Sequence, residues 1–333
     1  MKSQSLVWMA RKFGYMLAQI LTAITLSFIL IVSMPGNAYQ IVFSRLLRQG
    51  IPLQQAQIEA ASLVGYNATT PWYTKFFGYF NGILHGNLGY SIIYSLPVSK
   101  ILANAVPWTV LIVMVSLSLA FFTGWSAGLV AALHRGKKVD NILSATLSIF
   151  HSVPVYVLAV MLLITLGVLL HLAPIGGGEY APGLIPGFNL QFIGSVLYHL
   201  YLPILAFYLT LFPSWMFGTR AIATSVMKDD FVQSARARNI GGRRFLYSYV
   251  GKNSILPQYT HLMYSYGLLF GGSIFIESIF DINGLGFILA TSSAARDYFL
   301  ATGAFLVVVL AVILGNTIAD PSYGIIDPRV RAK

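Results

Sequence analysis

The polar residues at positions 230–239 have types and a spacing that suit a contact with a partner protein. Asp230 is followed three residues later by Gln233, the spacing of a capping box, which predicts a helix that has Asp230 as its N-cap. Asn239 predicts the end of that helix, because Asn tolerates the left-handed backbone of a helix C-terminus. The segment therefore predicts a short capped helix inside a longer polar loop, at positions 220–254.

The side chains of this predicted helix favour contact over bond-making chemistry. Ser234, Ala235 and Ala237 are small enough for another surface to approach closely. Arg236 and Arg238 can bond to acidic or carbonyl groups at the rim of such a surface. The alternative interpretation is a basic loop that lies on anionic lipid. The residues that we expect at a partner contact are Asp230, Gln233, Ser234, Ala235, Arg236, Ala237, Arg238 and Asn239.

The sequence lacks the motifs of common enzymes and of self-powered carriers. It contains no Cys, and neither Gly136-Lys137 nor Gly251-Lys252 has the upstream Gly of a phosphate-binding loop. No Asp, Glu, Lys or Arg lies near the middle of a long apolar run, where a proton- or sodium-coupled carrier usually needs an ionisable group. We therefore expect no enzyme activity, no bound cofactor and no metal, and energy supplied by another polypeptide if transport is active.

A few polar residues do lie within or at the ends of the apolar runs. Ser116, Ser118, Tyr266 and Ser273 could line a path for a solute. The alternative is that such side chains bond to their own backbone or to a neighbouring helix. We expect Glu277 in an outer vestibule or at a contact between subunits, because a carboxylate is costly at membrane depth unless it is paired or wetted.

The long runs without charged residues predict an all-α integral membrane protein. The chain is 56% hydrophobic and 9% charged, whereas soluble domains carry about 25% charged residues. A membrane-spanning helix needs roughly 20 apolar residues, and six runs are long enough. Pro154 predicts a kink or a restart within the third span. The expected spans are 13–34, 104–133, 142–171, 196–217, 255–279 and 299–319.

Lys and Arg residues are distributed unevenly among the predicted loops. They concentrate before the first span, in the second and fourth loops and at the C-terminus. The positive-inside rule therefore places both termini and the loop at 220–254 in the cytoplasm, and a sizeable segment at 35–100 outside. In this interpretation the net charge of +11 reflects topology in a lipid bilayer, with no nucleic-acid partner. Early Pro residues predict helices at 52–63 and 71–84 of the external segment.

Several segments, in order along the chain, resemble permease subunits of ABC importers of the dipeptide and oligopeptide class. The residues from Asp230 to Asn239, with Asn253 and Pro257 after them, are similar to the EAA loop of that family. The other similar segments, which bring the resemblance to about residues 11–331, are Gly86-Asn-Leu-Gly-Tyr-Ser91 with Pro97-Val98, Pro107 through Arg135-Gly136, Ser152-Val-Pro154, Glu277-Ser-Ile-Phe280 with Gly284-Leu-Gly286, Arg296-Asp-Tyr298, and Asp320 with Tyr323 and Asp327-Pro-Arg-Val-Arg331. The chain departs from the family pattern at Asn239, Tyr249 and Asn283, where Gly, His and Pro are usual.

The resemblance implies a type I ABC importer fold, with residues 1–333 forming one transmembrane permease domain in the cytoplasmic membrane. The chain would be the B-type inner-membrane subunit of a binding-protein-dependent system. The implied partners are a homologous second permease, two cytoplasmic ATPase subunits that hold ATP and Mg, and an external substrate-binding protein. The loop at 220–254 would carry the motion of the ATPases into the spans and drive alternating access.

The resemblance also bears on the solute and the outer gate. It implies a di- or oligopeptide as solute, with oligosaccharides or nickel in related systems. Gly284, Leu285 and Gly286 join the candidate pathway or outer gate. The external segment would contact the binding protein or cap the outer mouth, with Trp72 and Tyr73 as candidate contacts.

Two other classes of function remain as alternatives. The first is a membrane scaffold or receptor that transports nothing and uses the basic cytoplasmic loop to bind lipid or a partner. The second is a passive channel, for which the sequence contains no signal of a ring-forming selectivity filter. A neighbouring set of genes for a second permease, ATPases and a binding protein would favour the importer, and its absence would favour the scaffold.

Overall fold

The computed structural model describes residues 2–33, 38–64 and 70–326, and these residues are predominantly helical. They form two compact units, which are described separately. The first unit comprises Met1–Thr109 and Asn283–Ile313, and the second comprises Val110–Ile282 and Leu314–Lys333. Two long helices, α5 (Val98–Leu133) and α13 (Tyr298–Ile326), contribute residues to both units.

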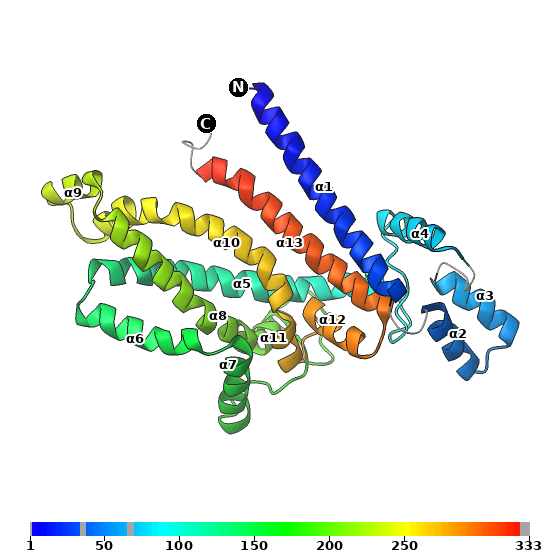
Figure 1. The fold of residues 1–333 in the computed structure, drawn as a ribbon. Helices are drawn as coiled ribbons and strands as arrows, with labels where there is room; N and C mark the ends of the chain where they lie inside the picture. Colours follow the sequence, from blue (N-terminus) through cyan, green and yellow to red (C-terminus); the bar gives the residue numbers. More distant parts are fainter. Residues whose placement is uncertain (1, 34–37, 65–69, 327–333) are drawn as a thin grey trace. The chain divides into compact units, whose positions relative to one another are not determined.

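The first unit contains α1 and a group of short helices (Figure 1). The predicted helices at 52–63 and 71–84 are confirmed as α3 and α4. The structure adds α2, which packs against α3 and which the sequence analysis missed. The signal for α2 was the four-residue spacing of Val42 and Leu46, both of which are buried. The helices that belong wholly to this unit are α1 (Lys2–Ser33), α2 (Ala38–Arg48), α3 (Leu53–Val64), α4 (Trp72–Leu84) and α12 (Leu285–Ala294).

A polar link joins two distant segments of the first unit. The buried carboxylate of Asp297 accepts hydrogen bonds from the Ser91 hydroxyl at 2.6 Å and from the Ile93 backbone N–H at 3.0 Å. Gly89 has a φ of +90° and lies so close to Phe299 that a Cβ there would be 2.6 Å from a ring carbon. The segments around 86–91 and 296–298, which both carry the resemblance, therefore meet in the structure.

The second unit is a bundle in which α6, α7 and α10 each pack on α8. Gly124 and Gly128 allow α5 and α8 to cross closely, because a Cβ at either position would lie 2.6 Å from an atom of α8. The elements that belong wholly to this unit are α6 (Lys138–Ser152), α7 (Val155–Leu162), the π-helix η1 (Leu163–Leu169), α8 (Leu190–Val226), α9 (Asp230–Ala237), the π-helix η2 (Arg244–Gly251), α10 (Lys252–Gly272) and α11 (Ile274–Ile279).

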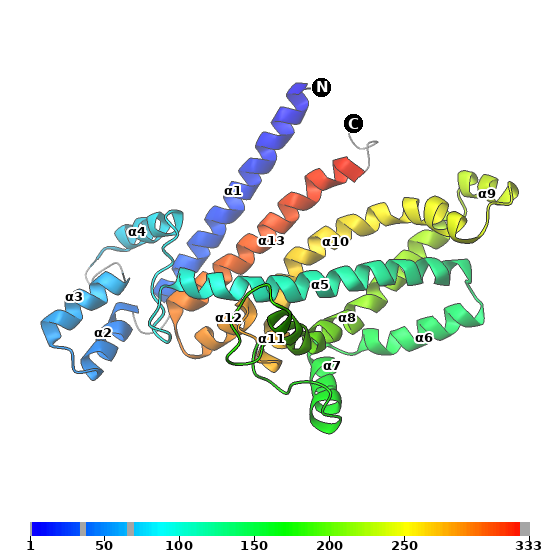
Figure 2. The ribbon, with the colours of Figure 1, turned by 180° about the vertical axis from the view of Figure 1, so that it is seen from behind.

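Four of the predicted spans fall on helices that are long and apolar enough to cross a membrane. These are α5, α8, the stretch Ala10–Ser33 of α1 and the stretch Tyr298–Gly315 of α13. The third predicted span is not one straight helix, because α6 and the α7–η1 segment meet at an angle of 97° (Figure 2). The break lies at Pro154, as predicted, because Val153 before it is held in an extended conformation.

The fifth predicted span, 255–279, falls on α10 and α11, which are separated at Ser273. Neither helix is among the long apolar helices of the described residues. The structure therefore supports an all-helical membrane protein, and the number of six spans and the cytoplasmic placement of both termini stay predictions.

Candidate functional site

The predicted contact helix is present as α9, in the loop between α8 and η2 (Figure 1). The predicted capping box is wrong: the N-cap is Asp229, and Asp230 is the first helical residue. Gln233 does not reach back to the start of its own helix, because its Nε2 donates to the carbonyl of Met227 at 2.7 Å. Gln233 therefore fastens α9 to the C-terminal end of α8.

The end of α9 has the predicted left-handed turn. Asn239 has a φ of +57°, and Gly242 has a φ of +63°. The Ile240 N–H bonds to the Ala235 carbonyl at 3.1 Å across this turn, a pattern that closes helix C-termini. Asn239 thus takes the conformation for which Gly is usual, which explains why the departure from the family pattern is tolerated.

Helix α9 has one face buried in its own chain. Val232 is fully buried and Ala235 is 3% exposed. The expectation that Ala235 is available to a partner is therefore wrong, since its small side chain allows α9 to pack on the core of this subunit. The other buried members of that cluster come from α5, α8 and η2, and are Leu129, Ala132, Ala223, Phe245, Leu246 and Val250.

The opposite face of α9 is exposed and mostly polar. Arg236 places its guanidinium over the ring of Phe245, 5.4 Å from the ring centre, so this cation is positioned by the buried cluster. Phe231 adds an apolar side chain that is 44% exposed. The exposed residues of α9 and its C-terminal turn are Asp230, Phe231, Gln233, Ser234, Arg236, Ala237, Arg238 and Asn239.

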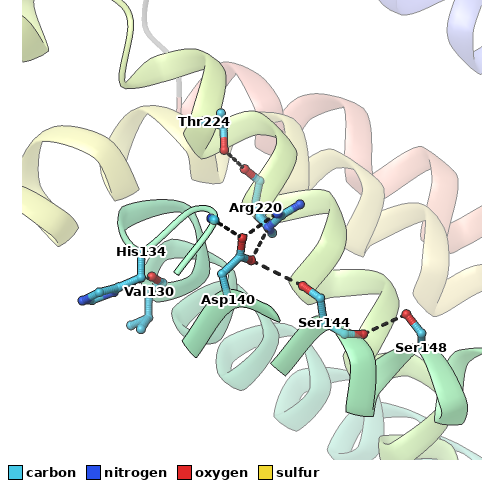
Figure 3. Close-up of polar contacts among 8 residues, drawn as sticks. Val130, His134, Asp140, Ser144, Ser148, Arg220 and Thr224 are labelled. Atoms are coloured by element: carbon cyan, nitrogen blue, oxygen red, sulfur yellow. Dashed lines mark hydrogen bonds and ion pairs between the residues drawn. The ribbon is translucent and has the colours of Figure 1, made fainter. Parts of the chain in front are cut away.

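An ion pair near this loop ties α6 to α8, and sequence reasoning missed it (Figure 3). Arg220 donates from Nε to Asp140 Oδ1 at 2.6 Å and from Nη2 to Oδ2 at 2.7 Å. Asp140 is 1% exposed and also accepts from the Gly136 N–H at 2.9 Å, so its charge is well satisfied. The sequence contained a signal for this pair, because Asp140 lies at the start of one apolar run and Arg220 at the end of another.

The candidate pathway residues have defined contacts. Ser116 is buried and donates to the Ile112 carbonyl at 2.6 Å, the backbone hydrogen bond that the alternative interpretation predicts. The hydroxyl groups of Ser118 and Tyr266 lie 2.6 Å apart and link α5 to α10. A part in solute binding stays a prediction for these three residues.

Glu277 does not lie where its sequence position predicted. Glu277 and Ser273 are fully buried within the chain. The expectation that Glu277 lies in an outer vestibule or at a contact between subunits is therefore not met, because its side chain does not reach the surface of this chain. The Glu277 N–H donates to the carbonyl of Ser273, the N-cap of α11, at 2.9 Å.

The candidate gate segment lies at the start of α12, in the first unit. Gly284, Leu285 and Gly286 are all buried. The Leu285 N–H donates to the Thr109 hydroxyl at 2.8 Å, so the segment is fixed to α5. Among the residues that the structure describes, no group of three or more His, Asp or Glu side chains is arranged to hold a metal ion.

Comparison with known proteins shows the family. Residues 124–332, which include the whole loop at 220–254, match the model of the "binding-protein-dependent transport system inner membrane component" family, and the chain belongs to this family. It is thus a multi-pass permease component of the cytoplasmic membrane.

Curated relatives cover nearly the whole chain. A putative peptide permease protein of Brucella suis is 28% identical over 95% of this chain and 96% of its own length. The oligopeptide transport system permease protein AppB of Bacillus subtilis is 28% identical over 93% of this chain and 95% of its own. The dipeptide transport system permease protein DppB of Escherichia coli K12 is 26% identical over 98% and 99% of the two chains.

Proposed function

We propose that this chain is the permease subunit of an ATP-driven importer for di- or oligopeptides. The family membership supports a permease within a binding-protein-dependent system. The names of the relatives, which refer to peptide, oligopeptide and dipeptide transport, favour peptides over the oligosaccharides that the sequence analysis also allowed.

The observation that carries the coupling role is the two-sided construction of α9. Its buried face is packed with residues of α5, α8 and η2, and its exposed face carries charged and polar side chains. A protein that pushes on the exposed face moves a helix that is already part of the core of the second unit. Force applied there is transmitted to α5 and α8, which are long enough to span the membrane.

The proposal includes the partners that such a mechanism needs. Two cytoplasmic ATPase subunits with ATP and Mg dock at the exposed face of α9, in the loop 220–254 of this chain, and at the corresponding loop of a homologous second permease. An external binding protein delivers the solute to the cavity between the two permeases. Closure of the ATPases pulls or pushes α9 and switches the opening of the cavity between the two sides of the membrane.

The proposal also includes the topology, with six spans and both termini in the cytoplasm. The chain contains no native Cys, so accessibility of a single introduced Cys is easily measured. A Cys at Gly178 should react with an impermeant thiol reagent from outside intact cells. Reaction only after the cells are made permeable would contradict this orientation.

Uptake of a labelled dipeptide into vesicles tests the function. The vesicles contain the full set of subunits, and the expected uptake needs ATP and the binding protein. Ala237→Glu, on the exposed face of α9, should abolish this uptake, whereas Ser248→Glu, exposed in η2, serves as the matched charge control. Normal uptake by both variants would place the ATPase contact elsewhere. No ATP-dependent uptake of any peptide by the unaltered system would favour the scaffold alternative.

A further inference from the structure

Helix α4 has two apolar faces, and the described part of this chain covers one of them. The inner face packs on a buried cluster that contains Ala23 and Ile24 of α1 and Leu306 of α13. Phe76 adds an edge-to-face ring contact with Phe28 of α1, at 5.2 Å between ring centres. Figures 1 and 2 both show α4 beside α1. The α4 residues that pack on the cluster are Tyr79, Phe80 and Ile83.

The residues that receive α4 lie at membrane depth. Ala23 and Ile24 are near the middle of the apolar stretch Ala10–Ser33 of α1, and Leu306 is at the middle of the stretch Tyr298–Gly315 of α13. The central residues of a spanning helix lie near the centre of the roughly 30 Å hydrocarbon layer. The inner face of α4 therefore contacts two spanning stretches well inside their ends.

The outer face of α4 has the composition of a surface in contact with lipid. Trp72, Tyr73, Phe77 and Leu84 are each more than half exposed in this chain. The helix contains no acid, and Lys75 is its one charged residue. Trp and Tyr are enriched where membrane proteins meet the headgroup region, and an apolar helix of this length is typical of interfacial or re-entrant segments.

We propose that α4 is embedded in the lipid bilayer beside α1, with its outer face in contact with phospholipid. Leu21 and Leu26 of α1, within the same apolar stretch as Ala23 and Ile24, are also exposed in this chain. The proposal replaces the expectation that Trp72 and Tyr73 contact the binding protein. It rests on the membrane-spanning character of α1 and α13, and it does not depend on the identity of the solute or on the orientation of the chain.

Helix α3 provides the contrast that makes the proposal testable. Ile58 of α3 is 73% exposed, and Phe77 of α4 is 65% exposed, so both are large apolar side chains on the surface of this chain. Ile58 has the polar side chains of Gln54, Gln55 and Glu59 as neighbours on the surface of α3. The two positions are similarly exposed in this chain, but the proposal predicts that Phe77 contacts lipid and that Ile58 contacts water.

The test uses spin labels on Phe77→Cys and Ile58→Cys in the full-length chain, which has no native Cys. Membrane vesicles from cells that express the complete transport system are opened by freezing and thawing, so that both aqueous faces are reached. For each spin label, the rate of collision with oxygen, which concentrates in lipid, is compared with the rate of collision with a water-soluble nickel chelate. Leu84→Cys gives a second, independent position on the outer face of α4.

The account predicts a ratio of oxygen to nickel collision that is several times higher at positions 77 and 84 than at position 58. Equal ratios at positions 77, 84 and 58 would overturn the proposal, because α4 would then lie in water. Protection of positions 77 and 84 from both reagents would also overturn it, because another protein would then cover this face.

Discussion

Helices α4 and α9 are built alike on their inner sides and differ on their outer sides. Each is a short helix whose inner face packs on helices long enough to span a membrane. The outer face of α9 carries Asp230, Arg236 and Arg238, whereas the outer face of α4 carries Trp72, Tyr73 and Phe77. The exposed composition therefore distinguishes a surface for an aqueous protein partner from a surface for lipid, although both faces are exposed in this chain.

The largest effect should come from a charge placed on the buried face of α9. Val232→Asp puts a carboxylate into a fully buried apolar site, and an unpaired buried charge costs several kcal/mol. We expect loss of the folded chain, measured by size-exclusion chromatography after heating in detergent. Ser234→Asp, at a nearby exposed position of the same helix, should elute as the unaltered protein does. A stable Val232→Asp variant would show that α9 is not part of the core.

The next effect concerns the ion pair that fixes α6 to α8 near α9. Arg220→Ala leaves the buried carboxylate of Asp140 without its cation. Removing one partner of a fully buried pair costs 3–5 kcal/mol, and because Arg220 is 32% exposed we expect about 2 kcal/mol. The measurement is the midpoint of thermal unfolding in detergent. Adding Asp140→Asn should recover part of the loss, and a double variant less stable than either single variant would contradict the pairing argument.

A charge on the outer face of α4 should cost less, because the side chain can reach the headgroup region. Phe76, the neighbour of Phe77, contacts α1 at Phe28, between the centre and the end of the stretch Ala10–Ser33. Phe77→Lys is therefore expected to destabilise the inserted protein by roughly 1.5 kcal/mol, since a Lys at this level can extend its ammonium group toward water. Ile58→Lys on α3 should be neutral. Equal unfolding midpoints for the two Lys variants in lipid nanodiscs would argue that both helices lie in the same medium.

The smallest effect should come from the hydroxyl pair that joins α5 and α10. Ser118→Ala and Tyr266→Phe each remove one partner of a single neutral hydrogen bond, which contributes about 1 kcal/mol. The double-variant cycle should give a coupling energy of that size. A coupling energy near zero, together with reduced peptide uptake, would assign the pair to the solute pathway in place of the structural link.

The sequence predicted the structure correctly where an apolar pattern repeats or where a residue strongly favours one backbone conformation. Apolar runs located the long helices, Pro154 located the break of the third predicted span, and Asn239 located the end of α9. Sequence patterns do not predict a contact that depends on which residue packs opposite a side chain. Ala235 is equally suited to a partner or to its own core, and the structure assigns it to the core.

The bonding of Gln233 and the surroundings of Asp140 and Glu277 were missed for the same reason. Gln233 could accept from a backbone N–H at the start of α9 or donate to a carbonyl at the end of α8, and it donates to the end of α8. Asp140 and Arg220 are 80 residues apart in sequence, so their pairing depends on how α6 packs against α8. Glu277 is buried by tertiary packing that its position at the end of an apolar run does not specify.

One measurement tests the central claim most directly: photo-crosslinking from Ala237 and from Phe77 in the same membranes. A photoreactive amino acid replaces each residue in turn in cells that express the full transport system. The account predicts a crosslink to an ATPase subunit from position 237, and from position 77 crosslinks to lipid without any to protein. If position 237 gave no crosslink to an ATPase subunit and position 77 gave a crosslink to a protein, the assignment of α9 to the coupling contact and of α4 to the bilayer would be contradicted.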